Sequence, residues 1–391
     1  MATTVYPISY WCAPPTDAAR YREAAACGFT VVPVPADTPE AGRLALDLCA
    51  ENDIQGIVID PRIHRGLPQQ EGWEQVVAAV ARDYAAHPAL FGYFLTDEPS
   101  LGHFDALAQL VAAFAAADPQ HAAFINLFPN YASPDQLGVI DYTQHVRAYL
   151  ETVRPAFLSY DHYALMEWGD RPGYFANLEI IRAEALRAGV PFWNIILATP
   201  HFDYRDPSPA DLRWQANTTL AYGGKGLAYF TYWTPDVENF RDGIIGLDGR
   251  PTPKYDAVAR LNRELRGVGQ HMLGLTSTAV HHWPDAPAGA RVLPLDGLVA
   301  GVDGGEYVIG EFRDEAGLPW VYLANRDRAR SARVTLYLRT SHASLSEVAR
   351  GSGELRPVVL DQAAEAVRRY ADGLSVHFWL GPAEGKLMRL G

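Results

Sequence analysis

The 391-residue sequence has few cysteines, a deficit of positive charge and no long apolar run. Its 3 cysteines, Cys12, Cys27 and Cys49, form no C-x-x-C pair, which argues against a disulfide scaffold or a zinc ribbon. Lysine and arginine number 33 against 46 acidic residues, a net charge of −13. Because an acidic chain repels phosphate groups, we expect neither nucleic acid nor an anionic membrane as a partner.

No segment approaches the roughly 18 consecutive apolar residues that span a bilayer. The first nine residues carry neither the basic nor the apolar region of a signal peptide, so we expect a cytoplasmic protein, with a secreted form whose signal was removed as the alternative. What the sequence does have is 48% hydrophobic residues, enough for packed cores, together with 9 Trp and 20 Tyr. Such aromatics suit stacking on sugar rings as well as ordinary core packing.

Short apolar runs alternate with longer amphipathic runs over the first 272 residues. The predicted strands cover residues 7–12, 29–35, 54–60, 90–96, 122–127, 156–160, 192–197 and 226–232. The predicted helices cover residues 18–27, 39–51, 73–86, 104–117, 142–153, 174–188, 209–222 and 255–265. Eight such units predict a (β/α)₈ TIM barrel over residues 1–272. A doubly wound sheet is the alternative, but no G-x-G-x-x-G follows the first strand.

The pattern changes after the barrel. Residues 273–391 contain short runs that alternate at period two, such as 307–312 and 333–338, separated by turn sequences such as Asp303-Gly304-Gly305. We therefore expect a small antiparallel β-sandwich domain over residues 273–391.

Active sites of (β/α)₈ barrels lie at the carboxyl ends of the strands. The candidate side chains at those ends are Trp11, Asp60, Asp97, Glu98, Asn126, Tyr160, Asp161, His162, Asn194, His201, Tyr232 and Trp233. Each also has a structural interpretation: Asp60, for example, precedes a proline and could cap a turn, and Asp97 could begin the following helix. Several acids, amides and aromatics at one rim favour a functional site.

The segment Leu90-Phe91-Gly92-Tyr93-Phe94-Leu95-Thr96-Asp97-Glu98-Pro99 resembles the fourth strand of clan A glycoside hydrolases, whose motif is Asn-Glu-Pro. The resemblance implies that Glu98 is the general acid/base, with Asp97 in place of the asparagine that holds the sugar 2-hydroxyl. The sequence Tyr229-Phe230-Thr231-Tyr232-Trp233 resembles the eighth strand of the clan, which implies that Trp233 closes the floor of the first sugar subsite. Residues 249–255 resemble the post-barrel segment of β-galactosidase-like family 42.

The sequence departs from the clan at the seventh strand. Clan members carry a nucleophilic glutamate there, whereas residues 191–200 contain no acid. A glycosidase needs two carboxylates, one to protonate the leaving oxygen and one to act as nucleophile or to activate water. We expect the second to be Asp161, at the end of the sixth strand, with Asp60, Asp236 and Glu238 as further candidates.

These observations predict a glycoside hydrolase that acts on a glycoside or oligosaccharide without a metal or other cofactor. One alternative is a metal-dependent sugar isomerase or epimerase with ligands drawn from Asp60, Glu98, Asp161, His162 and His201. Another is a carbohydrate-binding protein whose glycosidase site has decayed. The sequence leaves open the sugar, the anomer, exo or endo action, retention or inversion, and the oligomeric state.

Overall fold

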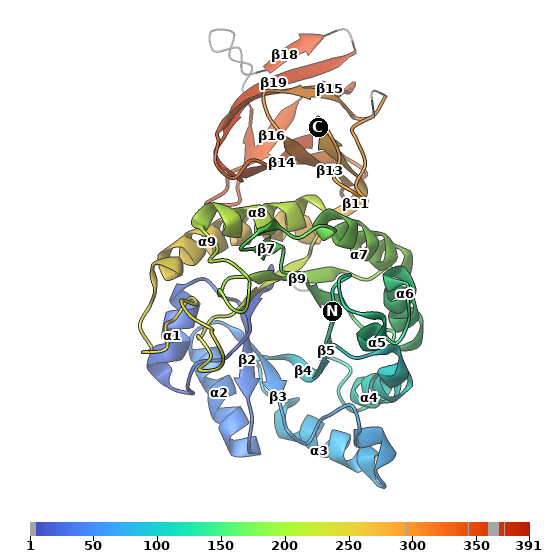
Figure 1. Cartoon of the computed structure of the whole chain (residues 1–391), viewed down its shortest axis with the longest axis vertical. Helices are drawn as coiled ribbons and strands as arrows, with labels where there is room; N and C mark the ends of the chain where they lie inside the picture. The colour runs from blue at the N-terminus through green and yellow to red at the C-terminus, as the bar shows by residue number, and fades with distance from the viewer. Residues whose placement is uncertain (1–4, 295, 343, 359–366, 371) are drawn as a thin grey trace.

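The computed structural model describes residues 5–294, 296–342, 344–358, 367–370 and 372–391. A ring of parallel strands is surrounded by helices, with a β-rich part at one end (Figure 1). Eight strands run in the order β1-β10-β9-β6-β5-β4-β3-β2, which confirms the predicted TIM barrel. Their bounds are β1 (Ile8–Tyr10), β2 (Val31–Pro35), β3 (Gln55–Ile59), β4 (Leu90–Asp97), β5 (Ala122–Leu127), β6 (Leu158–Asp161), β9 (Phe192–Leu197) and β10 (Gly226–Phe230).

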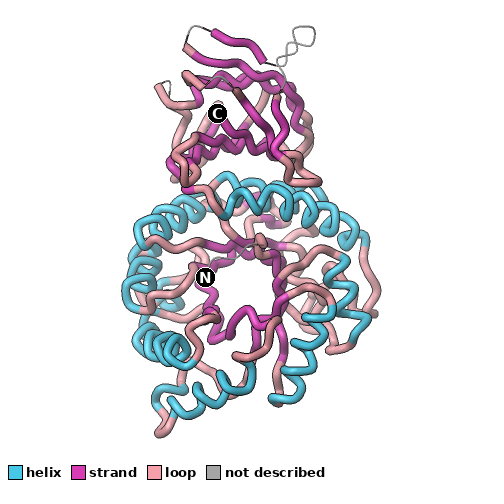
Figure 2. The backbone as a smooth tube through the Cα atoms, turned by 180° about the vertical axis from the view of Figure 1, so that it is seen from behind, coloured by secondary structure: helices cyan, strands magenta, loops and turns pink. Residues whose placement is uncertain are grey.

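The barrel is nearly closed, and a single residue joins its two edge strands. The Thr30 N–H donates to the Ile8 carbonyl oxygen at 2.9 Å, and the Ile8 N–H donates to Thr30 Oγ1 at 2.8 Å. Inside, aromatic side chains from alternate positions fill the ring; they include Phe91, Phe124, Phe157 and Trp193. Figure 2 shows the ring from behind. The barrel is thus a packed core with its chemistry confined to the strand ends.

The helices follow the predicted pattern: α1 (Ala18–Ala26), α2 (Pro39–Glu51), α3 (Trp73–Tyr84), α4 (Phe104–Ala117), α5 (Pro134–Leu137), α6 (Tyr142–Thr152), α7 (Tyr174–Ala188), α8 (Pro209–Ala221) and α9 (Pro253–Leu273), with 3₁₀ turns η1 (Leu67–Gln69) and η2 (Leu101–His103). Helix α9 is longer than predicted. Thr252 caps its N-terminus with Pro253 at the first helical position, and the helix continues through the buried Gly267 and Gly269 to its C-cap at Gly274. None of the helices described has the length and apolar character needed to cross a bilayer.

The β-rich part confirms the predicted antiparallel domain. One sheet has the order β11-β13-β14-β20-β16-β17 and the other β12-β15-β19-β18, and both contribute to one apolar core. The bounds are β11 (Thr276–Trp283), β12 (Val299–Asp303), β13 (Tyr307–Arg313), β14 (Pro319–Asn325), β15 (Ala332–Arg339), β16 (Leu345–Val348), β17 (Leu355–Pro357), β18 (Val367–Tyr370), β19 (Gly373–Leu380) and β20 (Gly385–Leu390). A small hairpin, β7 (Leu165–Met166) and β8 (Gly169–Asp170), follows β6.

Helix α8 lies between the barrel and this β domain (Figure 1), and its side chains are buried on both faces. Its buried polar groups therefore need internal partners. Gln215 exchanges hydrogen bonds with the Leu197 backbone of β9, accepting at 2.9 Å and donating at 3.0 Å. On the other face, the Tyr322 hydroxyl of β14 donates to Asn217 Oδ1 at 2.6 Å. One helix thus ties the barrel to the β domain.

A close backbone approach at this interface gives a test of the packing. A Cβ atom on Gly310 of β13 would lie 2.1 Å from the Ala221 carbonyl oxygen at the end of α8. We expect Gly310→Ala to lower the free energy of unfolding by about 1 to 3 kcal/mol, measured by urea denaturation, because the two backbones must separate. Gly301→Ala in β12 is the matched control, since its nearest contact is 3.6 Å away. Equal stability of the two variants would contradict the close packing of β13 on the end of α8.

Candidate active site

Two carboxylates from different strands share one amide at the carboxyl end of the barrel. Asn126, at the end of β5, donates from Nδ2 to Asp97 Oδ1 of β4 at 3.1 Å and to Asp161 Oδ1 of β6 at 2.9 Å. The Ser159 hydroxyl donates to Asn126 Oδ1 at 3.0 Å, which fixes the orientation of the amide. The predicted residues Asp97, Asn126 and Asp161 therefore form one hydrogen-bonded cluster.

Glu98 stands at the turn where β4 ends. Its φ of 46° lies in the left-handed region, where a non-glycine residue is uncommon and needs support from its surroundings. That support includes a hydrogen bond from the Glu98 N–H to the Asn126 carbonyl oxygen at 2.8 Å. Asn126 thus holds Asp97 and Asp161 through its side chain and Glu98 through its backbone.

The environment of the cluster favours protonated carboxyl groups. Burial, followed by the charge of Asp97, raises the pKa of Glu98 to about 7. Asp97 is exposed as a residue. The protein atoms around its carboxyl group nevertheless exclude much of the water there, and this burial raises its pKa to about 6. Asp161 is only 4% exposed, and burial together with the charges of Glu98 and Asp97 raises its pKa well above the ordinary range. The three acids therefore cannot all be ionised together at neutral pH.

Aromatic side chains flank the acids. The Tyr163 ring lies 5.1 Å from the Phe230 ring, and the His201 ring lies 5.2 Å from Phe230. The Tyr131 hydroxyl accepts a hydrogen bond from the Tyr163 N–H at 3.4 Å, and the charge of Asp161 contributes, after burial, to the raised pKa of both tyrosines. The Arg171 guanidinium stacks 4.1 Å from the Tyr131 ring. A tyrosine-rich wall with one cation thus borders the cluster.

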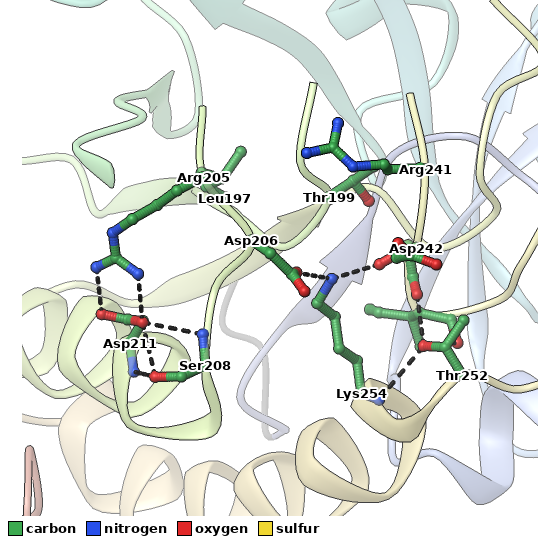
Figure 3. Close-up of polar contacts among 12 residues, drawn as sticks. Leu197, Thr199, Arg205, Asp206, Ser208, Asp211, Arg241, Asp242, Thr252 and Lys254 are labelled. Atoms are coloured by element: carbon green, nitrogen blue, oxygen red, sulfur yellow. Dashed lines mark hydrogen bonds and ion pairs between the residues drawn. The ribbon is translucent and has the colours of Figure 1, made fainter. Parts of the chain in front are cut away.

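Two ion pairs, each with one partly exposed partner, hold the loops that carry part of this wall (Figure 3). Lys254 of α9 pairs with Asp206 in the loop after β9 and donates to the Asp242 carbonyl oxygen in the loop after β10. Arg205 forms a two-pronged pair with Asp211 at 2.7 Å on both arms, and Asp211 also belongs to the capping box of α8. The His201 ring in the loop after β9 stacks on the Phe240 ring in the loop after β10, with centroids 4.5 Å apart, so the two loops also contact each other.

Five predicted candidates lie outside the cluster. For most of them the reason is that strand side chains alternate between the barrel interior and the helix layer. Ser159 and Asp161 of β6 share one face, whereas Tyr160 and His162 lie on the other. His162 sits between the Tyr131 and Tyr174 rings, and burial lowers its pKa to about 3, so it is neutral. Tyr160 lies in the large core cluster of the helix layer.

The same alternation turns Asn194 and Asp60 toward the helix layer, whereas Tyr232 lies two residues beyond the end of β10. Asn194 of β9 donates to Thr219 Oγ1 of α8 at 2.8 Å. Tyr232 stacks on Tyr10 with ring centroids 4.5 Å apart. The Asp60 carboxylate accepts from Arg62 at 2.9 and 2.7 Å and from the Tyr84 hydroxyl at 3.1 Å, which makes it an anchor for the loop before α3.

The two predicted tryptophans differ in their surroundings. Trp11, after β1, packs edge-on against Phe94 of β4 at 5.7 Å and so faces the barrel interior. Trp233 packs on the Arg20 guanidinium of α1 at 5.1 Å. The aromatic ring from the end of β10 that contacts the tyrosine wall is that of Phe230, and the sugar-facing role of Trp233 stays a prediction.

The remaining candidates are exposed or dispersed. Asp236 and Glu238 lie exposed on the loop after β10. Within the part of the chain that the structure describes, no three His, Cys, Asp or Glu side chains are grouped as a metal ion requires. Sequence reasoning missed Ser159, which its position two residues before Asp161 could have indicated, and Tyr131, which lies in a loop with no recognisable pattern.

No family model matches the sequence, and no curated protein matches it. The fold, in contrast, is shared with solved enzymes. A family 5 glycoside hydrolase from Bacteroides vulgatus superposes with a TM-score of 0.62 at 12% identity over 99% of this chain and 89% of its own. Another glycoside hydrolase superposes with a TM-score of 0.60 at 12% identity, covering 98% of this chain and 92% of its own. A β-galactosidase from the psychrophilic Marinomonas ef1 superposes with a TM-score of 0.53 at 10% identity, covering 69% of this chain and 62% of its own. The chain therefore shares the architecture of a (β/α)₈ barrel followed by a β-rich domain with these structures.

The raised pKa of Glu98 predicts a pH-dependent cost in stability. A carboxyl group whose folded pKa exceeds its unfolded pKa contributes full stability below the unfolded value, near 4.5, and loses it as the pH rises through about 7. We therefore expect Glu98→Gln to exceed the wild type in free energy of unfolding by about 1 to 3 kcal/mol at pH 8 and to match it at pH 4.

Urea unfolding at both pH values measures this difference. Glu315→Gln, at an exposed glutamate in the β13–β14 turn, is the matched control and should show no such pH dependence. A Glu98→Gln variant that is equally stable or less stable than the wild type at pH 8 would contradict the electrostatic description of the cluster.

Proposed function

We propose that the protein is a glycoside hydrolase in which Glu98 is the general acid/base and Asp161 the second carboxylate. The observation that carries this proposal is the placement of Asp97, Glu98 and Asp161 around Asn126 at the carboxyl end of the barrel. Acids with raised pKa values at this face are typical of sites that transfer protons to a leaving group. The shared fold with solved glycoside hydrolases supports the same reading.

The roles follow from exposure and charge. Glu98 is half-buried at the mouth, so its carboxyl can reach a glycosidic oxygen. Its pKa of about 7 keeps much of it protonated near neutral pH, as a general acid requires. After burial, the charge of Glu98 contributes to the raised pKa of Asp161, so Asp161 ionises most readily while Glu98 is protonated. Positive charge that develops on the sugar stabilises an ionised Asp161.

Asp97 has a binding role in this scheme. Its Oδ1 and that of Asp161 contact the same Asn126 nitrogen and are therefore at most about 6 Å apart, which leaves room for a sugar hydroxyl but not for a whole ring. A carboxylate at this position can accept hydrogen bonds from sugar hydroxyls, and in the resembling clan A motif this position carries the asparagine that holds the sugar 2-hydroxyl. Membership of family 42 stays a prediction, because the seventh-strand glutamate of the clan is absent from residues 192–197.

Two other functions were compatible with the sequence. A metal-dependent isomerase needs a ligand set, and His162, Asp60 and His201 are each engaged in packing or hydrogen bonds apart from one another. A binding protein with a decayed site has no need for acids whose pKa values are raised toward neutrality. Both observations favour the hydrolase.

We expect Glu98→Gln to lower kcat by about 10²- to 10⁴-fold on glycosides with poor leaving groups, because the proton donor is lost and the shape is kept. Activated aryl glycosides need less protonation and should lose much less. Asp161→Asn should lower kcat by a comparable factor on both kinds of substrate, since its role does not depend on the leaving group. Steady-state kinetics over a panel of aryl and alkyl glycosides measures both effects.

Asp236→Asn is the matched control, because Asp236 is an exposed acid on the loop after β10. It should keep wild-type kinetics. Wild-type turnover by Glu98→Gln on an alkyl glycoside would disprove the assigned role of Glu98, and wild-type turnover by Asp161→Asn would remove Asp161 from the mechanism.

The pH profile gives an independent check. The first step uses protonated Glu98, so kcat/KM should fall as the pH rises through about 7. In Asp97→Asn the neighbouring charge is removed while burial remains, so this alkaline limb should move to lower pH. An alkaline limb that keeps its position, or moves to higher pH, would show that the charge of Asp97 does not raise the pKa of the titrating group.

A further inference from the structure

The β1 to β4 side of the barrel mouth contains an apolar cavity of about 150 Å³ that the mechanism above does not use. Strands β1 to β4 supply most of its wall, and the principal lining side chains are Trp11, Pro35, Ile57, Ile59, Phe94 and Trp193. Ile59 is 37% exposed, so solvent and small ligands can enter. Exposed apolar side chains inside a barrel mouth indicate a surface that a ligand covers.

The cavity adjoins the acid cluster along two strands. Phe94 precedes Asp97 by three residues on β4, and its ring lies 5.7 Å from that of Phe124. Phe124 precedes Asn126 by two residues on the same face of β5, a rise of about 7 Å. The distance from the acids to the cavity is therefore little more than the width of one six-membered ring.

The lining chemistry excludes a sugar ring as the occupant. No lining side chain is charged or carries an amide, and the polar groups are the Ser9 and Tyr10 hydroxyls, the Cys12 thiol and the indole N–H groups of Trp11 and Trp193. A hexose buried there would leave several hydroxyl groups without partners, at about 1 to 3 kcal/mol each. An apolar ring has no such requirement, and an engineered cavity of about this volume in another protein binds benzene.

We propose that this cavity is the aglycone site, and that the substrates are glycosides whose aglycone carries an aromatic ring. The proposal rests on the glycosidase function above. The sugar then contacts the acids and the tyrosine wall, with the glycosidic oxygen at Glu98. On cleavage the bond between the anomeric carbon and this oxygen breaks and the aglycone oxygen takes the Glu98 proton. Water then supplies the hydroxyl group of the released sugar and returns its other proton to Glu98. The aromatic alcohol is left in the cavity.

Binding of the free aglycone tests the site without turnover. Benzyl alcohol should bind full-length Glu98→Gln protein with a Kd on the order of 1 mM, measured by calorimetry. Ala228→Leu fills the cavity and should weaken binding at least tenfold. Ile59→Asn, at a partly exposed position that tolerates a polar group, should weaken it about three- to tenfold. Ile140→Asn, an 89% exposed isoleucine elsewhere on the barrel, is the matched control and should bind as the parent does.

Absence of benzyl alcohol binding, or binding unchanged in both cavity variants, would overturn the proposal. Turnover separates this outcome from failure of the proposed function. Benzyl and methyl glycosides of the same sugar release alcohols of similar acidity, so the ratio of their kcat/KM values reports the cavity. In the wild type kcat/KM should be at least tenfold higher for the benzyl glycoside than for the methyl glycoside. In the Ile59→Asn variant this ratio should fall toward one. An equal ratio with Glu98-dependent turnover overturns the aglycone site alone, whereas no turnover of any glycoside overturns the proposed function.

Discussion

The hydrogen bonds of one amide, that of Asn126, hold the candidate site together. Its nitrogen contacts carboxylates from β4 and β6, its oxygen accepts from Ser159, and its backbone carbonyl accepts from Glu98. This arrangement requires the register in which Asp97 pairs with Asn126 and Asn126 with Ser159 across three adjacent strands. A slip of one residue on β5 would turn the amide into the helix layer and leave two acids facing each other without a donor.

The mouth of the barrel is chemically divided because different strands end in different side chains. Strands β4 to β6 present acids, an amide and hydroxyls, while β1 to β3 present proline, isoleucine and tryptophan. A glycoside with an apolar aglycone has the same division, with hydroxyls on one side of the glycosidic oxygen and hydrocarbon on the other. The division also sets the electrostatics, since an apolar wall beside the acids limits their solvation and raises their pKa values.

Three neighbouring acids destabilise the folded chain, and the surrounding structure offsets that cost. Functional sites commonly carry such strain and depend on a rigid scaffold to maintain it. Here the scaffold extends beyond the barrel: α8 is buried between β9 and the antiparallel domain, and Asn217 accepts from Tyr322 of that domain. On the open face, the Lys254 ion pair links the loops after β9 and β10 to α9 (Figure 3). The helix layer on one side of the barrel and the loops at its mouth are therefore held by contacts distant in sequence.

The sequence alone determined the eight strand–helix units, the antiparallel domain and the strand ends at which Glu98, Asn126 and Asp161 stand, because hydrophobic periodicity and glycine or proline stops are local properties. It did not decide which residues at a strand end face inward. Tyr160 and Asp161 are adjacent and therefore face opposite sides, and only the pairing of β6 with β5 and β9 fixes which of them faces inward. Nor could it place Tyr131, a loop residue, beside Asp161, since that contact exists only once the barrel has closed.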